Sequence, residues 1–245
     1  LTKMVREGAD YGEGLEKAQE LGYAERSPEA DVEGHDACRK IAILSSLITG
    51  KHVDAGQIHT EGITSITPGD FAYARAAGCS IKLLASSRIQ EDGSVYACVA
   101  PFLVEASHPL AAVNDVFNGV LVTGNMVGDV MFYGPGAGKL PTASAVVADV
   151  IDCAKSGGGA TPCGWTREAA SLGNFSQAEH VFFVRAREAD REAVLAAFPV
   201  DRLLEAEGGA EDFGFFTKAM EEGTFADQYE KLGNKVLGRI RYLAG

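Results

Sequence analysis

The hydrophobic period of this 245-residue chain changes partway along, and that change constrains the fold more than any other feature. Up to about residue 77 the apolar residues recur at helical spacing. Residues 81–88 and 94–105 are instead predicted to alternate as strands around the turn Gln90-Glu-Asp-Gly93. Alternation on both sides of a glycine-containing turn is typical of a β-hairpin. Helices followed by such strands predict an α+β fold, in which helices cover a mixed or antiparallel sheet.

The helical spacing predicts helices over residues 2–21 and 34–49 and a third one after Thr67-Pro68, where an N-cap threonine precedes a proline at the first helical position. Residues 119–133 predict two more short strands. Residues 141–155 are rich in Ala and Val, and because apolar residues surround this helix on nearly all sides, we expect it to be buried.

A glycine-rich stretch containing Gly157-Gly-Gly159 divides the chain. We predict a main domain over residues 1–156, a linker over 157–177 and a small βαββαβ appendage over 178–245. The appendage is predicted to contain strands at 180–187, 200–206, 212–218 and 236–243, and helices at 191–198 and 224–232.

Composition excludes several classes of protein. A formal net charge of -12, without clustered Lys and Arg, argues against a nucleic-acid or anionic-membrane partner. The apolar runs are too short to cross a bilayer. Five widely spaced cysteines predict neither a metal site nor a disulfide framework. Because the chain starts at Leu1 without a charged and apolar leader, we expect a piece of a cytoplasmic protein rather than a secreted one.

A possible proton-transfer pair lies at the start of the second predicted helix. At about 100° per residue, Asp36 and Lys40 fall in the middle of a face whose other members are apolar. Burial disfavours the lysine ammonium and a nearby carboxylate favours it, and this opposition suits a lysine for proton transfer. The apolar members of that face, which we expect to meet the core, are Ala37, Ile43, Leu44, Leu47 and Ile48.

The same spacing has a structural interpretation. Asp at position i and Lys at i+4 form a common stabilising pair on exposed helices, and a lysine can bury its stem while its ammonium reaches water. On spacing alone, both interpretations stay open.

A glycine-rich turn, Gly134-Pro-Gly-Ala-Gly138, precedes Lys139 and could hold a phosphate through backbone N–H groups. It lacks the spacing of the known phosphate and dinucleotide loops, and a tight turn from strand to helix needs glycine in any case. A phosphate-binding transferase is disfavoured because no metal-holding acidic motif accompanies the turn.

The remaining polar candidates have structural interpretations. Histidines such as His59 and His180 have no catalytic partner at a motif spacing. Glu61-Gly62-Ile63 is expected to form a core strand or turn. Lys82 is expected to pair with an acidic group rather than to act as a catalyst. Four acidic residues of the appendage predict a solvated loop: Glu205, Glu207, Glu211 and Asp212.

Six blocks in order resemble the homoserine dehydrogenase family. The resemblance runs from Leu1 to about Ser156. The blocks are Tyr23-x-Glu25, Asp31-x-x-Gly34-x-Asp36-x-x-x-Lys40, Glu61-Gly-Ile-Thr64, Ile81-Lys-Leu-Leu84, His108-Pro-Leu110 and Tyr133-Gly-x-Gly-Ala-Gly138-x-x-Pro-Thr142-Ala-Ser-Ala-Val146.

The resemblance implies NAD(P)-dependent interconversion of L-homoserine and L-aspartate 4-semialdehyde, on the route to threonine and methionine. It implies that Lys40 gives and takes the proton at the substrate oxygen while Asp36 positions it. Glu25 would bind the substrate amino group, with Asp31 and Tyr23 in the same pocket. On the cofactor side, Gly136 and Gly138 would pack their backbone against NAD(P). A homodimer is the expected assembly.

The chain also departs from the family pattern. The family begins with a dinucleotide-binding domain, and nothing of that kind precedes Leu1. We therefore expect the chain as given to be inactive. The appendage resembles an ACT-type regulatory domain, but Ala193 stands where such domains use a glycine, so threonine regulation is not expected. The alternative is a non-catalytic amino-acid-sensing or assembly module, and the upstream reading frame would separate the two.

Overall fold

The computed structural model describes residues 29–157, 159, 162–205 and 211–244, together with positions 12 and 16. The helix predicted over residues 2–21 therefore falls outside the description, apart from those two positions.

The described elements fall into three classes. The α-helices are α3 (Glu29–Val32), α4 (His35–Thr49), α5 (Pro68–Ala76), α6 (Lys139–Lys155), α7 (Arg191–Ala197) and α8 (Glu222–Leu232). The strands are β1 (His59–Thr60), β2 (Cys79–Ile89), β3 (Val95–Glu105), β4 (Phe117–Gly124), β5 (Gly128–Pro135), β6 (Glu179–Arg187), β7 (Val200–Leu204), β8 (Asp212–Thr217), β9 (Met220–Glu221) and β10 (Val236–Leu243). Short 3₁₀ turns are η1 (Ala55–Gln57), η2 (Pro109–Ala112), η3 (Phe175–Gln177), η4 (Glu188–Asp190) and η5 (Gly233–Lys235).

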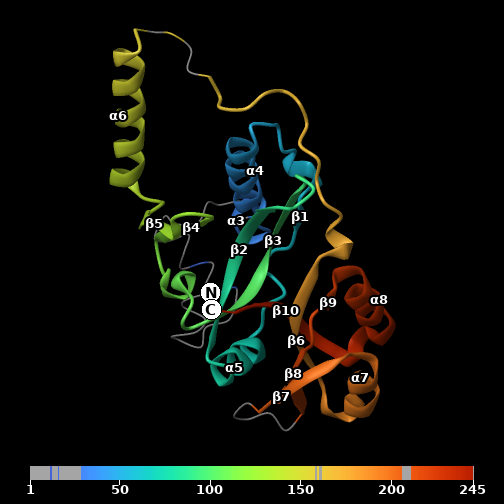
Figure 1. Cartoon of the computed structure of the whole chain (residues 1–245). Helices are drawn as coiled ribbons and strands as arrows, with labels where there is room; N and C mark the ends of the chain where they lie inside the picture. The colour runs from blue at the N-terminus through green and yellow to red at the C-terminus, as the bar shows by residue number, and fades with distance from the viewer. Residues whose placement is uncertain are drawn as a thin grey trace.

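One mixed sheet runs through most of the molecule (Figure 1). Its strand order is β1-β3-β10-β6-β8-β7, and β2 pairs with β3 along its whole length in antiparallel register. The last strand, β10, pairs in parallel with β3 and antiparallel with β6. The sheet therefore continues across the predicted boundary between main domain and appendage. The predicted α+β class is confirmed.

Several predicted elements are confirmed. The hairpin of β2 and β3 turns at Gln90 to Gly93, as predicted. The expected alternation is wrong for β3, which is buried at every position except Glu105 because apolar clusters cover both of its faces. Helix α5 begins after Thr67, whose backbone N–H and hydroxyl both donate to the Asp70 carboxylate. The bond from the Thr67 N–H to the side chain three residues later is one half of a capping box. In the C-terminal region β6, α7, β7, β8, α8 and β10 follow in the predicted βαββαβ order.

Apolar clusters cover both faces of the sheet. Helix α5 packs on one face through Phe71 and Tyr73, beside the buried β6 residue Phe183. Helices α7 and α8 cover the C-terminal strands through Val194 and Phe225. Burying large aromatic side chains is the main favourable contribution to the stability of such a layer.

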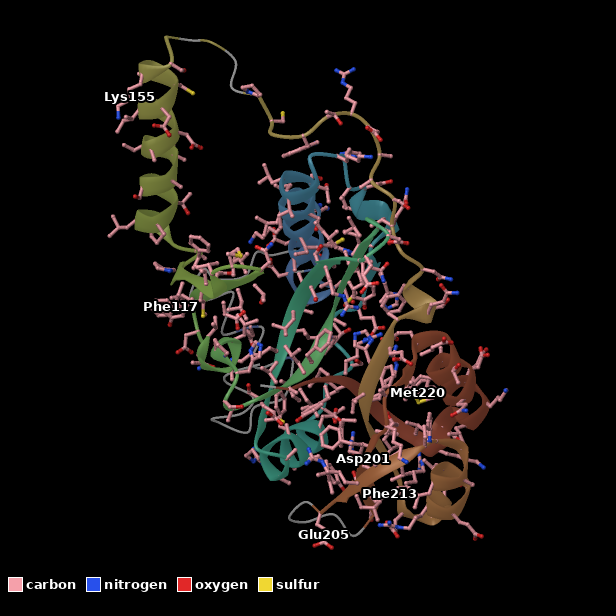
Figure 2. All side chains as sticks on the ribbon, viewed as in Figure 1. Phe117, Lys155, Asp201, Glu205, Phe213 and Met220 are labelled. Atoms are coloured by element: carbon pink, nitrogen blue, oxygen red, sulfur yellow. The ribbon has the colours of Figure 1, made fainter. Side chains whose placement is uncertain are left out.

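Helix α6 contradicts its prediction of burial. Among the described residues, none of α6 is buried, and Leu140, Val146 and Val150 are exposed. Figure 2 shows the side chains of this helix pointing away from it on every side up to Lys155. Within the described residues this helix has no neighbour that could bury its apolar side chains. The Ala- and Val-rich sequence therefore predicted the hydrophobicity of α6 correctly and its burial wrongly.

The segment after α6 is partly tied to the sheet. Residues of the predicted linker exchange backbone hydrogen bonds with the end of α4 and the start of β3. Ala170 donates to His52, His52 donates to Glu168, and Val95 donates to Ser171. The described part of this segment, from residue 162, therefore runs alongside the main domain before it enters β6.

Candidate active site

The predicted proton-transfer pair forms at the start of α4. Lys40 Nζ lies 2.7 Å from Asp36 Oδ2, one helical turn away. Both side chains are exposed, at 65% for Lys40 and 46% for Asp36. The pair therefore lies at the surface of the described structure, where a bound molecule could reach the ammonium.

The predicted burial of this helix face is contradicted. Ile43, Leu44, Leu47 and Ile48 are all exposed among the described residues. Helix α4 instead packs on the sheet through small and polar side chains, namely Cys38, Ala42, Ser45 and Ser46. The pattern located the apolar stripe, but small side chains allow the opposite stripe to approach the sheet more closely.

The turn before α4 rests on the segment that follows β1. Gly34 is the N-cap of α4 with φ of 79°, a left-handed conformation that glycine adopts readily. A Cβ at this position would lie 3.0 Å from Val99 Cγ1 and 3.3 Å from Thr60 Cγ2. Gly34 therefore needs both its backbone freedom and its lack of a side chain.

Gly62 belongs to the segment that contacts the turn before α4, and it lies against the residues on the other side of Gly34. A Cβ on Gly62 would lie 2.5 Å from the Val32 carbonyl oxygen and 2.6 Å from Glu33 Cα. The next residue, Ile63, donates its N–H to the Val32 oxygen at 2.8 Å. Residues 60–63 are thus fixed against the end of α3 and the start of α4.

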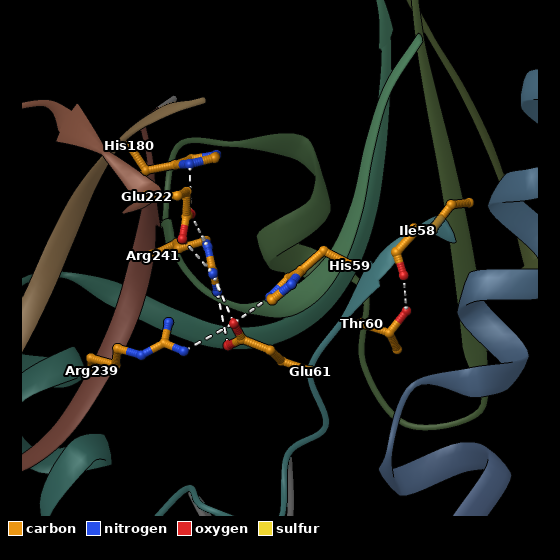
Figure 3. A network of polar contacts seen from close by, with 8 residues as sticks. All are labelled: Ile58, His59, Thr60, Glu61, His180, Glu222, Arg239 and Arg241. Carbon is orange, nitrogen blue, oxygen red and sulfur yellow. Dashed lines mark hydrogen bonds and ion pairs between the residues drawn. The ribbon is translucent and has the colours of Figure 1, made fainter. Parts of the chain in front are cut away.

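A network of charged side chains anchors this segment to the last strand (Figure 3). Arg241 donates from Nη1 to Glu61 Oε2 at 2.9 Å and from Nη2 to Glu61 Oε1 at 2.8 Å. Arg239 Nη2 donates to Oε1 at 3.0 Å, and His59 Nε2 lies 2.6 Å from the same oxygen. A bidentate guanidinium pair is among the strongest polar contacts in proteins.

These contacts change the titration of Glu61. Burial raises the pKa of the Glu61 carboxyl, but hydrogen bonds from His59 and Arg241 and the charges of Arg241 and Arg239 outweigh it. The pKa therefore lies far below the ordinary value of 4.5, and Glu61 is ionised at neutral pH.

The network continues into the C-terminal region. Arg241, whose side chain is only 1% exposed, also contacts both oxygens of Glu222, at 2.5 and 2.8 Å. His180 Nδ1 lies 2.9 Å from Glu222 Oε1. Burial raises the pKa of Glu222, and hydrogen bonds from His180 and Arg241 lower it below its usual value. One buried guanidinium therefore joins two carboxylates from distant parts of the chain.

Two interpretations made from sequence are corrected. The Glu61 side chain has a charged role beyond a core turn. In a separate ion pair, Asp212 accepts from Arg185 at 2.8 Å, so it is not part of a solvated loop. His59 and His180 pair with carboxylates, which fits the structural role expected of them. A sequence signal did exist: arginines at alternate positions of an otherwise apolar last strand require acidic partners on one face.

The glycine-rich turn joins β5 to α6. Gly138 is the N-cap of α6 with φ of 119°. A Cβ on Gly136 would lie 1.8 Å from Asn118 Nδ2, so the Asn118 amide lies directly against the backbone of this turn. Both predicted cofactor-contacting glycines thus occupy positions where a larger residue fits poorly.

A pocket of about 580 Å³ opens between β2, η2 and the start of β4. Lys82 lies in its wall and donates to the Val113 carbonyl and to Asn114 Oδ1. Burial lowers the pKa of Lys82, while Asp115 raises it. The acidic partner predicted for Lys82 is therefore Asp115, which acts on it through its charge. The hydrogen bonds of Lys82 go to the neutral oxygens of Val113 and Asn114.

The other predicted substrate-binding residues are only partly described. Asp31 lies in α3, three residues before Gly34, whereas Tyr23 and Glu25 lie outside the described residues. Within the described ranges, no group of three or more His, Cys, Asp and Glu side chains could hold a metal ion. A search of the same ranges finds no helix long and apolar enough to cross a membrane.

A family model described as homoserine dehydrogenase matches residues 1–151. The homoserine dehydrogenase of Mycobacterium tuberculosis strain H37Rv is 52% identical over 160 residues, which cover 64% of this chain and 36% of that protein. The Corynebacterium glutamicum homoserine dehydrogenase is 41% identical over 202 residues, covering 80% of this chain and 45% of its own length.

Solved structures extend the likeness to the C-terminal region. A Thiobacillus denitrificans homoserine dehydrogenase matches 99% of this chain with a TM-score of 0.84 and 31% identity, over 60% of its own length. A Staphylococcus aureus homoserine dehydrogenase matches 98% of this chain with a TM-score of 0.75 and 32% identity, over 61% of its own length. The chain therefore spans between about a third and three fifths of these relatives.

Proposed function

Because this chain belongs to the homoserine dehydrogenase family, we propose that it forms the substrate-binding part of an enzyme that interconverts L-homoserine and L-aspartate 4-semialdehyde. Members of this family are NAD(P)-dependent oxidoreductases. The observation that carries the proposal is the Asp36–Lys40 ion pair, exposed at the start of α4 within the matched region.

Lys40 acts as the general acid and base. In the reductive direction its ammonium protonates the carbonyl oxygen of the semialdehyde as that oxygen gains charge, and in the oxidative direction the neutral amine takes the proton of the homoserine hydroxyl. Asp36 orients the lysine through the 2.7 Å contact. Bound NAD(P) supplies or accepts the hydride.

Acidic residues ahead of α4 bind the rest of the substrate. By its place in the family motif, Glu25 would bind the α-amino group, since a carboxylate is the natural partner of a substrate ammonium, and Asp31 and Tyr23 would belong to the same pocket. Asp31 is three residues from Gly34 and Lys40 is the sixth residue of α4, so the turn at Gly34 sets their relative positions.

The turn from β5 to α6 contacts the cofactor. Two features support this role: the Asn118 amide against Gly136, and the positive φ of Gly138 at the start of a long helix. A backbone without side chains lets a ligand approach closely, and free N–H groups at a helix start favour an anionic group. Gly136 and Gly138 would hold NAD(P) only from this side, with the rest of the cofactor bound elsewhere in the parent protein.

The exposed apolar side chains of α4 and α6 support contact with further protein surface, because contiguous exposed apolar patches usually mark an interface. We propose that the parent is a homodimer and that the chain alone does not turn over substrate.

The test joins this chain to the part of the Mycobacterium tuberculosis relative that precedes its matched region. The joined protein should reduce NADP with L-homoserine, and the chain alone should not. Robust cofactor reduction by the chain alone would contradict the proposed inactivity. An upstream reading frame without a dinucleotide-binding fingerprint would favour the sensing or assembly module instead.

A further inference from the structure

We propose that Glu61 and Arg241 are positioning residues for the Asp36–Lys40 pair. Arg241 on the C-terminal strand fixes Glu61, and the residues beside Glu61 fix the turn from which α4 starts. The inference rests on the proposed function of Lys40, and it adds that the last strand of the chain is part of the support of the active site.

The anchor is the bidentate contact between Arg241 and Glu61. Both side chains have additional partners that limit their freedom, since Glu61 also accepts from Arg239 and Arg241 also donates to Glu222. The Glu61 N–H donates to the Val99 carbonyl at 2.8 Å, so backbone and side chain of this residue are held by two neighbouring strands, β3 and β10.

The contact passes from Glu61 to the start of α4 through the backbone. Gly62 lies against Val32 and Glu33 with no room for a Cβ, and Ile63 donates to the Val32 oxygen. The Glu61 carbonyl oxygen itself would be 3.4 Å from a Cβ on Gly34. A shift of Glu61 therefore moves atoms that are in direct contact with both sides of the α3–α4 turn.

The rest of α4 is held independently of Glu61. Ser45 Oγ donates to Ser87 Oγ at 2.7 Å, and Ser46 Oγ accepts from the Val53 N–H at 2.9 Å. The first turn is held by Gly34, whose carbonyl accepts from the Cys38 N–H at 2.9 Å, and by the buried Cys38 side chain, which donates to the Ala55 carbonyl at 3.3 Å. Loss of the anchor should consequently move Asp36 and Lys40 relative to Asp31 without unfolding the helix.

The ion pairs of Arg241 with Glu61 and Glu222 are better explained by positioning than by stability. A buried ion pair contributes little net stability compared with apolar residues of the same volume, and its best-supported use is to fix one geometry. The nearly buried Arg241 guanidinium fixes the geometry at both Glu61 and Glu222. In a site where an ångström of misplacement costs about 10²-fold in rate, such an anchor has a measurable effect.

The experiment uses Glu61→Gln, which keeps the shape of the side chain, and Arg241→Lys, which keeps one charge. Arg185→Gln is the matched control. Arg185 is also a mostly buried arginine of the C-terminal region, but it pairs with Asp70 at 2.9 Å and does not touch residues 60–63.

The first measurement is amide hydrogen exchange of the chain. The Ile63 amide reports the contact with Val32, and the Phe182 amide, which donates to Thr217 Oγ1, reports global opening. In Glu61→Gln and Arg241→Lys, exchange of Ile63 should rise at least about tenfold relative to Phe182. In the control the ratio should stay unchanged. An unchanged ratio in the two test variants would overturn the proposal.

The second measurement is turnover by the joined protein described above. Glu61→Gln should lower kcat by about 10- to 100-fold with little change in the KM for NADP, while Arg185→Gln should retain kcat within about twofold. Faster exchange at Ile63 with unaltered kcat would also overturn the proposal. Lys40→Met separates the two claims: full turnover in that variant refutes the proposed function, whereas the Ile63 exchange ratio still decides whether Glu61 anchors the turn.

Discussion

The Arg241 guanidinium holds both oxygens of the Glu61 carboxylate at 2.8 and 2.9 Å, although 180 residues separate the two in the chain. This contact joins the last strand to the segment that supports the start of α4. The two regions predicted as separate domains therefore share one sheet and one buried charge network.

Replacing Arg241 by Met should destabilise the chain strongly. The variant leaves the buried Glu222 carboxylate and the half-buried Glu61 carboxylate without their shared partner, and breaking a buried pair in this way costs about 3–5 kcal/mol. Arg239→Met is the comparison, because the Arg239 side chain is 28% exposed and makes one 3.0 Å contact with Glu61, besides lying over the Phe225 and Tyr229 rings. Its cost should stay below about 1 kcal/mol. Urea unfolding measures both, and equal losses would contradict the assignment of Arg241 as the anchor.

Glu61→Gln should reduce the amount of unfolding free energy that the chain loses when the pH is lowered. In the folded chain the pKa of Glu61 is depressed, so the unfolded chain takes up this proton first, near its ordinary pKa of 4.5. The stabilisation is present above that pH and is lost as the pH falls below it. For one such group the slope is at most about 1.4 kcal/mol per pH unit.

Chemical unfolding at several pH values checks this prediction. The wild-type chain should lose more free energy of unfolding than Glu61→Gln between about pH 6 and about pH 4, although Glu222, whose pKa is also lowered, keeps part of the slope in both. Parallel curves for the two proteins would mean that Glu61 is not ion-paired in solution.

Gly62→Ala should destabilise the chain by about 1–3 kcal/mol, because the new Cβ would press against the backbone of Val32 and Glu33. Gly134→Ala is a suitable control, since a Cβ there meets nothing within 4 Å. The control should change stability by less than about 1 kcal/mol. Thermal unfolding measures both variants. A neutral Gly62→Ala would show that residues 60–63 do not pack tightly on the α3–α4 turn.

Lys40→Met should leave the stability of the chain within about 0.5 kcal/mol of the wild type. The Asp36–Lys40 pair is exposed, and exposed i,i+4 pairs contribute little to folding. Unfolding by urea gives this value directly. A loss above about 2 kcal/mol would indicate a structural role for the lysine and weaken any kinetic interpretation of the variant.

Sequence patterns predicted local structure better than they predicted what each surface contacts. The turn at Gln90 to Gly93 located the hairpin of β2 and β3, and Thr67-Pro68 located α5, because each signal is contained within a few residues. The apolar stripes of α4 and α6 were also found, but the pattern does not identify what covers them. Within the described residues they remain exposed.

In the candidate site, too, the local pairing was predictable from sequence and the long-range contacts were not. Asp36 and Lys40 are one turn apart, so their pairing follows from helix geometry. The support of that turn by Glu61 and Arg241 depends on β10 lying beside β3, which is a long-range pairing. Only the arginines at positions 239 and 241 of an apolar strand indicated that acidic partners were needed.

The most direct test of the proposed function is the kcat of Lys40→Met in the joined protein, with L-homoserine and NADP at saturating concentrations. If Lys40 is the general acid and base, kcat should fall by about 10²- to 10⁴-fold while the chain stays folded. A kcat within about threefold of the wild type would contradict the account, since proton transfer would then depend on another group.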